Sequence, residues 1–373
     1  MKLLMYDTAY VEGLAKTANR EDINDWLDLY YKDFSSNYTS DNDRTGSIIV
    51  PFKTYVPDDC KIPKFVSTNI TYEDAATNRV QEIIKLSEQT GKKINLLYSG
   101  GIDSSTVLTS FIKLLGVDEA AKRLTILMSY ESIVENPWMW EKFIRPNFAV
   151  ANSKSFDLTA LDSDRLYVNG ELNDQLFGAT APFKVGVKVS KKLGVSMDEM
   201  LVDEEFLHTT FELLGLTPSA NSKWSRALMK LMEGCPVNDG TFMTMAWWYG
   251  FTCKWINVKY RVFMFNNITT DTYQIPELIV KNNIAFFDSV DFQQWAMNNK
   301  QPKHLGSFES FKFTAKEYVS DLIGKEYSEK LKKLSFDKVL AMKKRTIAFD
   351  SEFKLYNNVN LEAIYQQNND FIR

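Results

Sequence analysis

A short polar turn after an apolar run carries the residue types best suited to chemistry. Residues 99–105 are Ser-Gly-Gly-Ile-Asp-Ser-Ser, between an apolar run at 94–98 and a pattern of helical spacing. Gly100 and Gly101 let the backbone approach a ligand, and the first backbone N–H groups of the following helix attract an anion. The carboxylate of Asp103 repels phosphate unless a cation lies between them. The simplest interpretation is a Mg²⁺ ion that bridges Asp103 and a polyphosphate.

A second group of acids follows a second predicted strand. Residues 166–168 end an apolar run, a turn that contains Gly170 comes next, and Glu171 and Asp174 follow it. The chain between Asp103 and Asp174 is long enough for two βα units. Because the carboxyl ends of parallel strands lie at one edge of a sheet, where ligands bind in such folds, we expect the two aspartates to face the same Mg²⁺.

The elements that must position these turns alternate between strand and helix. Strands are predicted over 94–98, 123–130 and about 148–156, and helices over 70–91, 106–115 and 135–147. This alternation predicts an α/β fold with a parallel twisted sheet flanked by helices. Further helices are predicted over residues 1–36 and throughout 180–260, so the C-terminal half is expected to be largely helical. The Trp-Trp-Tyr run at 247–249 is interpreted as core packing between helices.

Composition narrows the class of protein. The 373 residues suffice for two domains or one large one. A formal net charge of −4 gives no case for a nucleic-acid surface. Three cysteines without CxxC spacing predict reduced thiols and a cytoplasmic location. No stretch approaches 18 uncharged apolar residues, so we expect no membrane span.

The turn at 99–105 is not a P-loop, since it lacks the G-x-x-x-x-G-K-[ST] pattern. It resembles the SGGxDS signature of the N-type ATP pyrophosphatases, which include asparagine synthetase and beta-lactam synthetase. The stretch DRLYVNGELNDQLFGA, at 164–179, is similar to the SGEGADELFGG motif of those two synthetases. Leu172 stands where they have Gly, and Gln175 stands where they have Glu. Six positions of the motif match: Gly170, Glu171, Asp174, Leu176, Phe177 and Gly178.

Weaker similarities to asparagine synthetase follow in the same order along the chain. Residues 286–288, Phe-Phe-Asp, resemble the PFLD segment, and Lys312 stands at the Lys of a K-x-x-L-R helix. Lys333, in LKKLSF, stands at the Lys of an R-x-K-x-G-F segment. The resemblance covers about residues 75–340.

The resemblance implies a fold and a set of site residues. The fold is adenine nucleotide alpha hydrolase-like, of the PP-loop class, over residues 71–340, with an N-terminal segment at 1–70 and a C-terminal tail at 341–373. Asp103 and Asp174 are implied as metal ligands. Glu171 and Lys333 are implied as catalytic residues. The implied ATP-binding residues are Ser99, Gly100, Gly101, Asp103, Ser104, Ser105, Leu127, Met128 and Gly170.

The implied activity is that of an ATP-dependent carbon–nitrogen ligase with ATP and Mg²⁺ as cofactors. A substrate carboxylate attacks the α-phosphate and releases pyrophosphate, and ammonia or an amine then displaces AMP. Glu171 accepts or positions the amine proton, and Lys333 stabilises the anionic centre. Glutamine-dependent synthetases carry a glutaminase domain with an N-terminal Cys. Position 2 here is Lys2, so we expect no glutaminase activity, and a separate ammonia-supplying protein is an optional partner.

Two alternatives remain open at this point. The same turn serves nucleobase-modifying and tRNA-modifying enzymes, although this chain lacks a zinc-type cysteine set and a basic patch. The other alternative is a non-catalytic, nucleotide-binding homologue, for which Leu172 and Gln175 argue. The retained aspartates argue against it. The identity of the carboxylate and amine, the source of nitrogen and the oligomeric state are not specified by the sequence.

Overall fold

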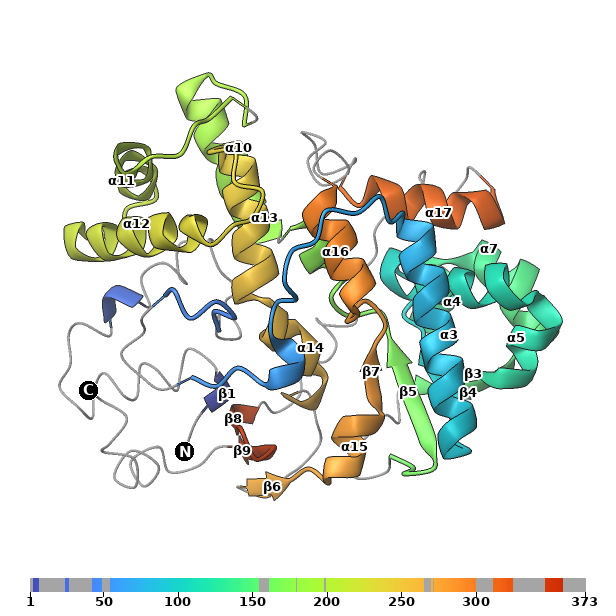
Figure 1. The fold of residues 1–373 in the computed structure, drawn as a ribbon. Helices are drawn as coiled ribbons and strands as arrows, with labels where there is room; N and C mark the ends of the chain where they lie inside the picture. The colour runs from blue at the N-terminus through green and yellow to red at the C-terminus, as the bar shows by residue number, and fades with distance from the viewer. Residues whose placement is uncertain are drawn as a thin grey trace.

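The structure is a computed structural model, shown as a ribbon in Figure 1. It describes residues 3–6, 24–26, 42–48, 54–153, 161–178, 180–197, 199–264, 270, 272–299, 311–324 and 346–357. Two sheets organise these residues. One is a five-stranded sheet on the right of Figure 1, and the other is a four-stranded sheet at the lower left.

The five-stranded sheet is entirely parallel, as the sequence predicts. Its strand order is β4-β3-β2-β5-β7. Successive strands run outward from β2 to β4, and the chain then returns to the other side of β2 to place β5. The order therefore reverses between β2 and β5, and open α/β sheets bind ligands outside the carboxyl ends of the strands at such a point. The strands are β2 (Lys93–Leu97), β3 (Leu124–Met128), β4 (Ala149–Asn152), β5 (Arg165–Asn169) and β7 (Asn283–Ala285).

Two long helices lead into and out of β2. Helix α3 (Tyr72–Thr90) begins at Thr71, whose side chain forms a capping box with Asp74, and ends at Gly91 in a left-handed conformation. Both boundaries agree with the prediction for 70–91. Helix α4 (Ile102–Leu115) starts directly after the Gly-Gly turn and is buried over most of its length. It packs against α3 and α17 (Phe313–Ile323), and α3 packs against α16 (Val290–Asn298).

Short helical pieces complete the parallel-sheet half. The helix predicted over 135–147 is interrupted at Asn136, which caps the next turn, and a π-helical turn occupies Trp140–Ile144. Proline at position 137 removes the N–H that would continue the preceding helix. The pieces are α5 (Val117–Arg123), α6 (Tyr130–Glu135), α7 (Pro137–Met139), α8 (Arg145–Asn147), α9 (Asn173–Phe177) and α15 (Glu277–Asn282).

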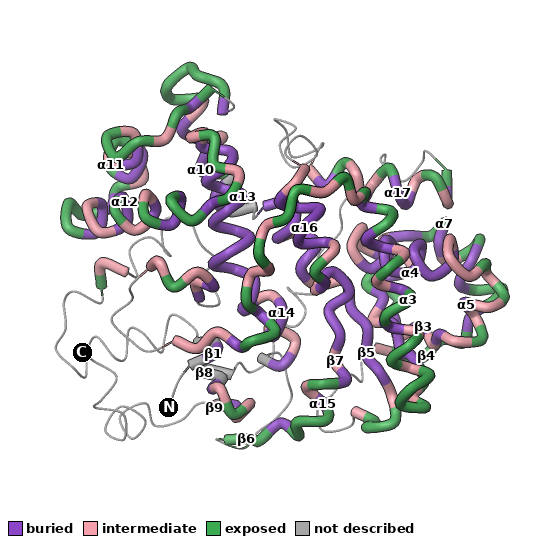
Figure 2. The backbone as a smooth tube through the Cα atoms, viewed as in Figure 1, coloured by how far each residue is buried: buried purple, intermediate pink, exposed green. Residues whose placement is uncertain are grey.

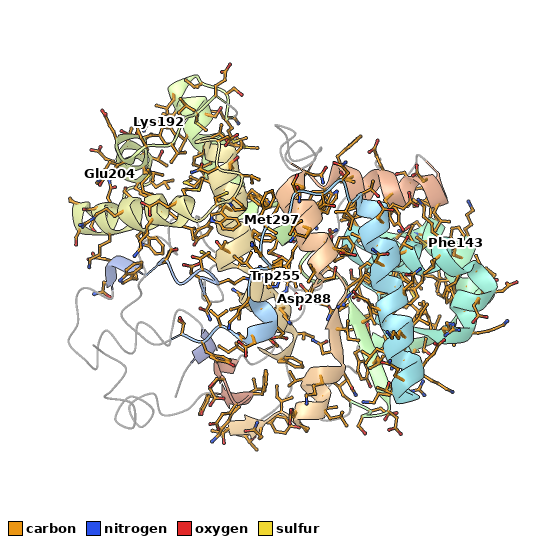
Figure 3. The ribbon with its side chains drawn as sticks, in the orientation of Figure 1. Phe143, Lys192, Glu204, Trp255, Asp288 and Met297 are labelled. Carbon is orange, nitrogen blue, oxygen red and sulfur yellow. The ribbon has the colours of Figure 1, made fainter. Side chains whose placement is uncertain are left out.

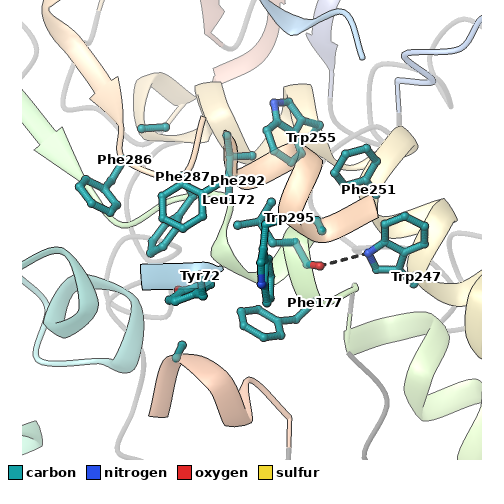
Figure 4. Close-up of a cluster of buried hydrophobic side chains, with 14 of the residues drawn as sticks. Tyr72, Leu172, Phe177, Trp247, Phe251, Trp255, Phe286, Phe287, Phe292 and Trp295 are labelled. Atoms are coloured by element: carbon teal, nitrogen blue, oxygen red, sulfur yellow. Dashed lines mark hydrogen bonds between the residues drawn. The ribbon is translucent and has the colours of Figure 1, made fainter. Parts of the chain in front are cut away.

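The helices predicted over 180–260 are present, and most of them lie at the upper left of Figure 1. Helix α13 is buried on every side (Figure 2), as expected of a helix that is apolar all round. The indole N–H of Trp247 donates to the Leu176 carbonyl at 3.1 Å (Figure 4), and that of Trp248 donates to the Leu231 carbonyl at 2.9 Å. The Trp247 bond therefore joins this half to the short helix that follows β5, and the Trp248 bond holds two helices of this half together. The helices are α10 (Thr180–Leu193), α11 (Glu204–Leu213), α12 (Pro218–Glu233), α13 (Phe242–Cys253) and α14 (Trp255–Met264).

The second sheet is antiparallel and joins distant parts of the chain in the order β1-β8-β9-β6. The prediction of a helix from residue 1 is wrong at its start, because Leu3–Tyr6 is a strand paired with β8. Local helical spacing is outweighed here by pairing with a strand far along the chain. Of the rest of 1–36, only 24–26 are described, and they are helical. The other strands are β6 (Thr272–Gln274), β8 (Thr346–Asp350) and β9 (Lys354–Asn357).

Charged side chains gather around the buried Lys259 and Arg44 where the two halves meet. The Lys259 ammonium contacts Asp288 at 2.5 Å and Asp59 at 2.7 Å. The Trp255 indole donates to the other oxygen of Asp288 at 3.3 Å, and Figure 3 shows these two side chains in the middle of the molecule. The guanidinium of Arg44 lies over the Trp255 ring, and its burial lowers the pKa of Arg44 to about 10. Among the described helices, none is both long and apolar enough to span a membrane.

Candidate active site

The turn after β2 is held by its own serines. Ser99 N–H and Ser99 Oγ both contact Ser104 Oγ at 3.1 Å, and the Gly101 N–H donates to Ser99 Oγ at 3.3 Å. Gly100 has a φ of +84°, and a Cβ there would collide with the Ser132 carbonyl oxygen. Glycine is therefore needed at this position for both conformation and space.

The three predicted serine hydroxyls have different surroundings. Ser99 is exposed at the mouth of the turn, whereas Ser104 and Ser105 are buried. The Ser105 hydroxyl lies 3.2 Å from the Tyr98 hydroxyl and accepts from the Asn136 amide at 3.1 Å. These contacts direct the Ser105 side chain into the core, so it stabilises the turn from its buried side. Of the three serines, only Ser99 is exposed, and its hydroxyl contacts Ser104 and Gly101 within the turn.

The turn after β5 fits directly against the turn after β2. A Cβ on Gly170 would lie 2.8 Å from the Asp103 carbonyl carbon and from the Ser104 nitrogen, which leaves no room for a side chain. Leu172 begins α9 in the left-handed region with a φ of 80°. A non-glycine residue there costs about 1–2 kcal/mol. Its side chain is buried among the aromatic rings of Figure 4, and this burial offsets the cost.

The carboxylates of Asp103 and Asp174 converge on one ammonium group. Lys312 Nζ lies 2.5 Å from Asp103 Oδ1 and 2.6 Å from Asp174 Oδ1. The Asn173 amide donates to the same Asp103 oxygen at 2.7 Å, and the Tyr72 hydroxyl donates to the Asn173 oxygen at 3.0 Å. This network fixes Asp103 from one side and leaves the Asp103 and Asp174 side chains 31% and 41% exposed.

Burial and pairing act in opposite directions on these groups. Burial raises the pKa of the Asp103 carboxyl, Lys312 opposes that rise, and the negative charge of Asp174 adds to it. For Lys312, burial alone would lower the pKa, but attraction to Asp103 and Asp174 outweighs it and raises the pKa. Lys312 is therefore charged at neutral pH.

A second ion pair lies on the same turn. Arg261 of α14 contacts the Glu171 carboxylate at 2.6 Å, and the Glu171 N–H donates to the Asn169 side chain at 2.9 Å. Both charged side chains are partly exposed, at 28% for Arg261 and 23% for Glu171. Glu171 is thus oriented by a cation from the other half of the molecule.

The remaining predicted residues divide into two groups. Leu127 and Met128 lie at the carboxyl end of β3, next to β2, where the Leu127 carbonyl accepts from the Tyr98 N–H at 2.8 Å. The Met128 side chain is buried and Leu127 is partly buried. Lys333 falls outside the described residues, as does most of the tail predicted at 341–373.

Sequence reasoning missed several contributors. It aligned Lys312 with a family position but gave it no role, and it gave none to Arg261 or Tyr72. A Glu135 carboxylate oxygen lies only 3.4 Å from where a Cβ of Gly101 would stand, so another acid borders the turn. No motif in the sequence around these residues distinguishes them from other charged or aromatic residues. Their spacing from the turns along the chain is too long for any periodic signal.

The donor set fits Mg²⁺. Two carboxylate oxygens that both lie within 2.6 Å of one nitrogen can both be reached by one metal ion. In the described part of the chain, no cluster of three or more His, Cys, Asp or Glu side chains forms a metal site. Mg²⁺ characteristically takes one or two protein carboxylates and completes its shell with phosphate and water. Asp103 and Asp174 meet that requirement once the Lys312 ammonium moves away.

Comparison with known proteins adds no relative. No family model, no curated protein and no solved structure matches this chain. The resemblance to the N-type ATP pyrophosphatases therefore depends on the sequence motifs alone.

Proposed function

We propose that this chain is an ATP-dependent, amide-forming ligase of the asparagine synthetase kind that adenylates a substrate carboxylate. The observation that carries the proposal is the convergence of Asp103 and Asp174 beside the turn at 99–105. The convergence lies where the strand order of the parallel sheet reverses. Because a polyphosphate needs both an anion-binding turn and paired carboxylates for its metal, the two features together favour nucleotide chemistry. The same strand order supports the PP-loop class for this sheet.

The chain's own groups divide the work of binding ATP. The exposed Ser99 and the first N–H groups of α4 receive the phosphates. Gly100 and Gly170 keep side chains out of the space between the two turns. The carboxyl end of β3, with Leu127 and Met128, borders the adenine. Mg²⁺ held by Asp103 and Asp174 would neutralise charge on the departing pyrophosphate.

The reaction has two steps. An oxygen of the substrate carboxylate bonds to the α-phosphorus as the bond from that phosphorus to the bridging oxygen of pyrophosphate breaks. Ammonia or an amine then bonds to the acyl carbon, its proton passes to Glu171, and the acyl–oxygen bond to AMP breaks. Arg261 holds the Glu171 carboxylate in one orientation throughout. Lys333 is proposed to stabilise the anionic centre.

The test is product analysis with α-labelled ATP and Mg²⁺, first with aspartate and ammonia and then with panels of carboxylates and amines. We expect AMP and pyrophosphate, with release abolished by Asp103→Ala. Asp291→Ala is the matched control, because Asp291 is a partly exposed acid in the first turn of α16 that accepts a hydrogen bond from Asn78. It should release pyrophosphate at the wild-type rate.

Other outcomes have definite meanings. ADP and phosphate as products, or intact ATP with every carboxylate, would refute the ligase proposal. ATP binding without turnover would favour the non-catalytic homologue. Pyrophosphate release that requires a nucleobase or tRNA in place of a carboxylate would identify the base-modifying class.

A further inference from the structure

Lys312 occupies the position between the paired carboxylates. Its side chain is 6% exposed, and its ammonium contacts one oxygen of Asp103 and one of Asp174. The ammonium lies between these two oxygens, so an ion that bridges them must take the place of the ammonium. Two cations in this small space would repel each other strongly. Metal and ammonium therefore compete for the same two oxygens.

The backbone of Lys312 has an unusual conformation that fixes where its side chain begins. It has a φ of 61°, in the left-handed region, and it precedes the first residue of α17. Its carbonyl accepts from the Lys316 N–H at 3.0 Å, which fixes it to the first turn. Helix α17 packs on α4, the helix that carries Asp103, and its residues Ala315 and Val319 are buried. An unfavourable backbone conformation that is retained this way is characteristic of functional positions.

The side chain can move while its backbone stays in place. Lysine carries its charge on four flexible carbons, and its ammonium donates in three directions without a fixed plane. The Asp103 and Asp174 carboxylates are partly open to solvent, so phosphate oxygens and metal can approach them. A nucleotide phosphate beside the turn offers the ammonium new acceptors of higher charge than a carboxylate.

We propose that Lys312 is a tethered cation that neutralises Asp103 and Asp174 in the nucleotide-free protein and transfers to the polyphosphate when metal and nucleotide bind together. This inference rests on the proposed nucleotide site. It assigns Lys312 as a phosphate-binding residue, and it makes the metal enter with the nucleotide and not before it. The Asp103 and Asp174 carboxylates can bind a metal ion only when the Lys312 ammonium has another anion to contact.

The experiment measures Mn²⁺ binding by electron paramagnetic resonance, with and without α,β-methylene-ATP, which cannot lose pyrophosphate. Wild-type protein should bind Mn²⁺ at this site only with the nucleotide analogue. Lys312→Met should bind Mn²⁺ alone, with a dissociation constant at least about tenfold lower than wild type, and should bind the analogue more weakly. Lys312→Arg keeps the charge and should exclude free metal as wild type does.

Lys113→Met is the matched control, because Lys113 of α4 also bridges two acids, Glu73 at 3.3 Å and Asp321 at 3.7 Å. Its metal binding should equal that of wild type. A melting temperature that rises with Mn²⁺ in Lys312→Met alone reports the same site without spectroscopy. Equal Mn²⁺ affinity of wild type and Lys312→Met without nucleotide would overturn the inference, whatever the outcome of the pyrophosphate assay. Absence of pyrophosphate release with an altered Mn²⁺ affinity would instead refute the ligase and leave the tethered cation standing.

Discussion

Two buried lysines in this protein each bridge a pair of aspartates. Lys312 joins Asp103 and Asp174 at the carboxyl edge of the parallel sheet. Lys259 joins Asp59 and Asp288 where the two halves of the molecule meet. Both ammonium groups are 10% exposed or less, and their distances to the carboxylates are nearly the same. Contact geometry alone does not distinguish the two pairs.

The surroundings of the two pairs differ. Lys259 stands inside the regular helix α14, and Asp288 is 12% exposed with its second oxygen taken by Trp255. Lys312 has a left-handed backbone, and its two partners lie on the turns of adjacent strands. The first arrangement fastens segments together. The second keeps two carboxylates at a place where a ligand can reach them. Asp59 is 63% exposed, so the exposure of the acids does not separate the two pairs. What distinguishes the proposed functional pair is the left-handed backbone of its lysine and the place of its two acids on the turns of adjacent strands.

The largest difference between the two lysine pairs should appear in the rate of pyrophosphate release. Asp174→Asn should lower pyrophosphate release by roughly a hundredfold or more, since it removes one of the two proposed metal ligands. Asp288→Asn should leave the rate per folded molecule near wild type, because Lys259 retains Asp59. Pyrophosphate release at 20 °C, normalised to the folded fraction from circular dichroism, measures both. Equal losses in the two variants would mean that the two lysine pairs do not differ in role.

Stability should rank the pairs in the opposite order. Lys259→Met leaves Asp288 buried without its cation, and we expect a loss of about 3–5 kcal/mol in the free energy of unfolding. Lys312→Met should lose less, because water reaches the partly exposed Asp103 and Asp174, and added Mg²⁺ should restore part of the loss. Urea denaturation with and without Mg²⁺ decides between these outcomes. A larger loss for Lys312→Met would contradict the division drawn here.

The close fit between the turn after β2 and the turn after β5 predicts an effect of intermediate size on stability and ATP binding. Gly170→Ala places a methyl group 2.8 Å from backbone atoms of Asp103 and Ser104, and should cost about 2 kcal/mol of stability and weaken ATP binding. Gly234→Ala is the control. Gly234 has a φ of −83°, and the nearest atom to its Cβ position is 3.6 Å away. That variant should stay within about 0.5 kcal/mol of wild type. Thermal melting and nucleotide titration provide the two measurements.

The smallest effect concerns the thiol beside the Lys259 pair. Burial raises the pKa of Cys60 to about 12, and Lys259 only partly opposes this. The stability that depends on the protonated thiol is complete below the ordinary thiol pKa of about 8.5 and is lost as pH rises from there towards the raised pKa of about 12. Between pH 7.5 and 9.5, Cys60 should contribute a loss of about 1.4 kcal/mol. Urea denaturation under reducing conditions should show a shallower pH slope for Cys60→Ala than for wild type. Identical slopes would exclude the buried thiol as the source.

The sequence was most informative about the parallel sheet and the turns at its carboxyl edge. Alternating apolar runs predicted the parallel sheet, and the rule that strands open at one edge predicted that Asp103 and Asp174 approach each other. What could not be predicted was set by contacts between distant parts of the chain. Lys312 pairs with Asp103, which lies 209 residues earlier in the chain. The segment at 3–6 is a strand because it pairs with β8. The inward Ser105 hydroxyl was missed because hydrogen bonding to Tyr98 depends on side-chain direction, which motifs do not encode.

The antiparallel sheet carries a consequence for synthesis in the cell. Its first strand, β1, pairs with β8, and that strand lies more than three hundred residues later in the chain. At translation rates of about 5–20 residues per second, β1 waits of the order of tens of seconds for its partner to leave the ribosome. During that time an apolar segment that includes Leu4, fully buried in the finished protein, stays open to solvent. β1 can therefore take its place in the antiparallel sheet only after the residues of β8 have been synthesised.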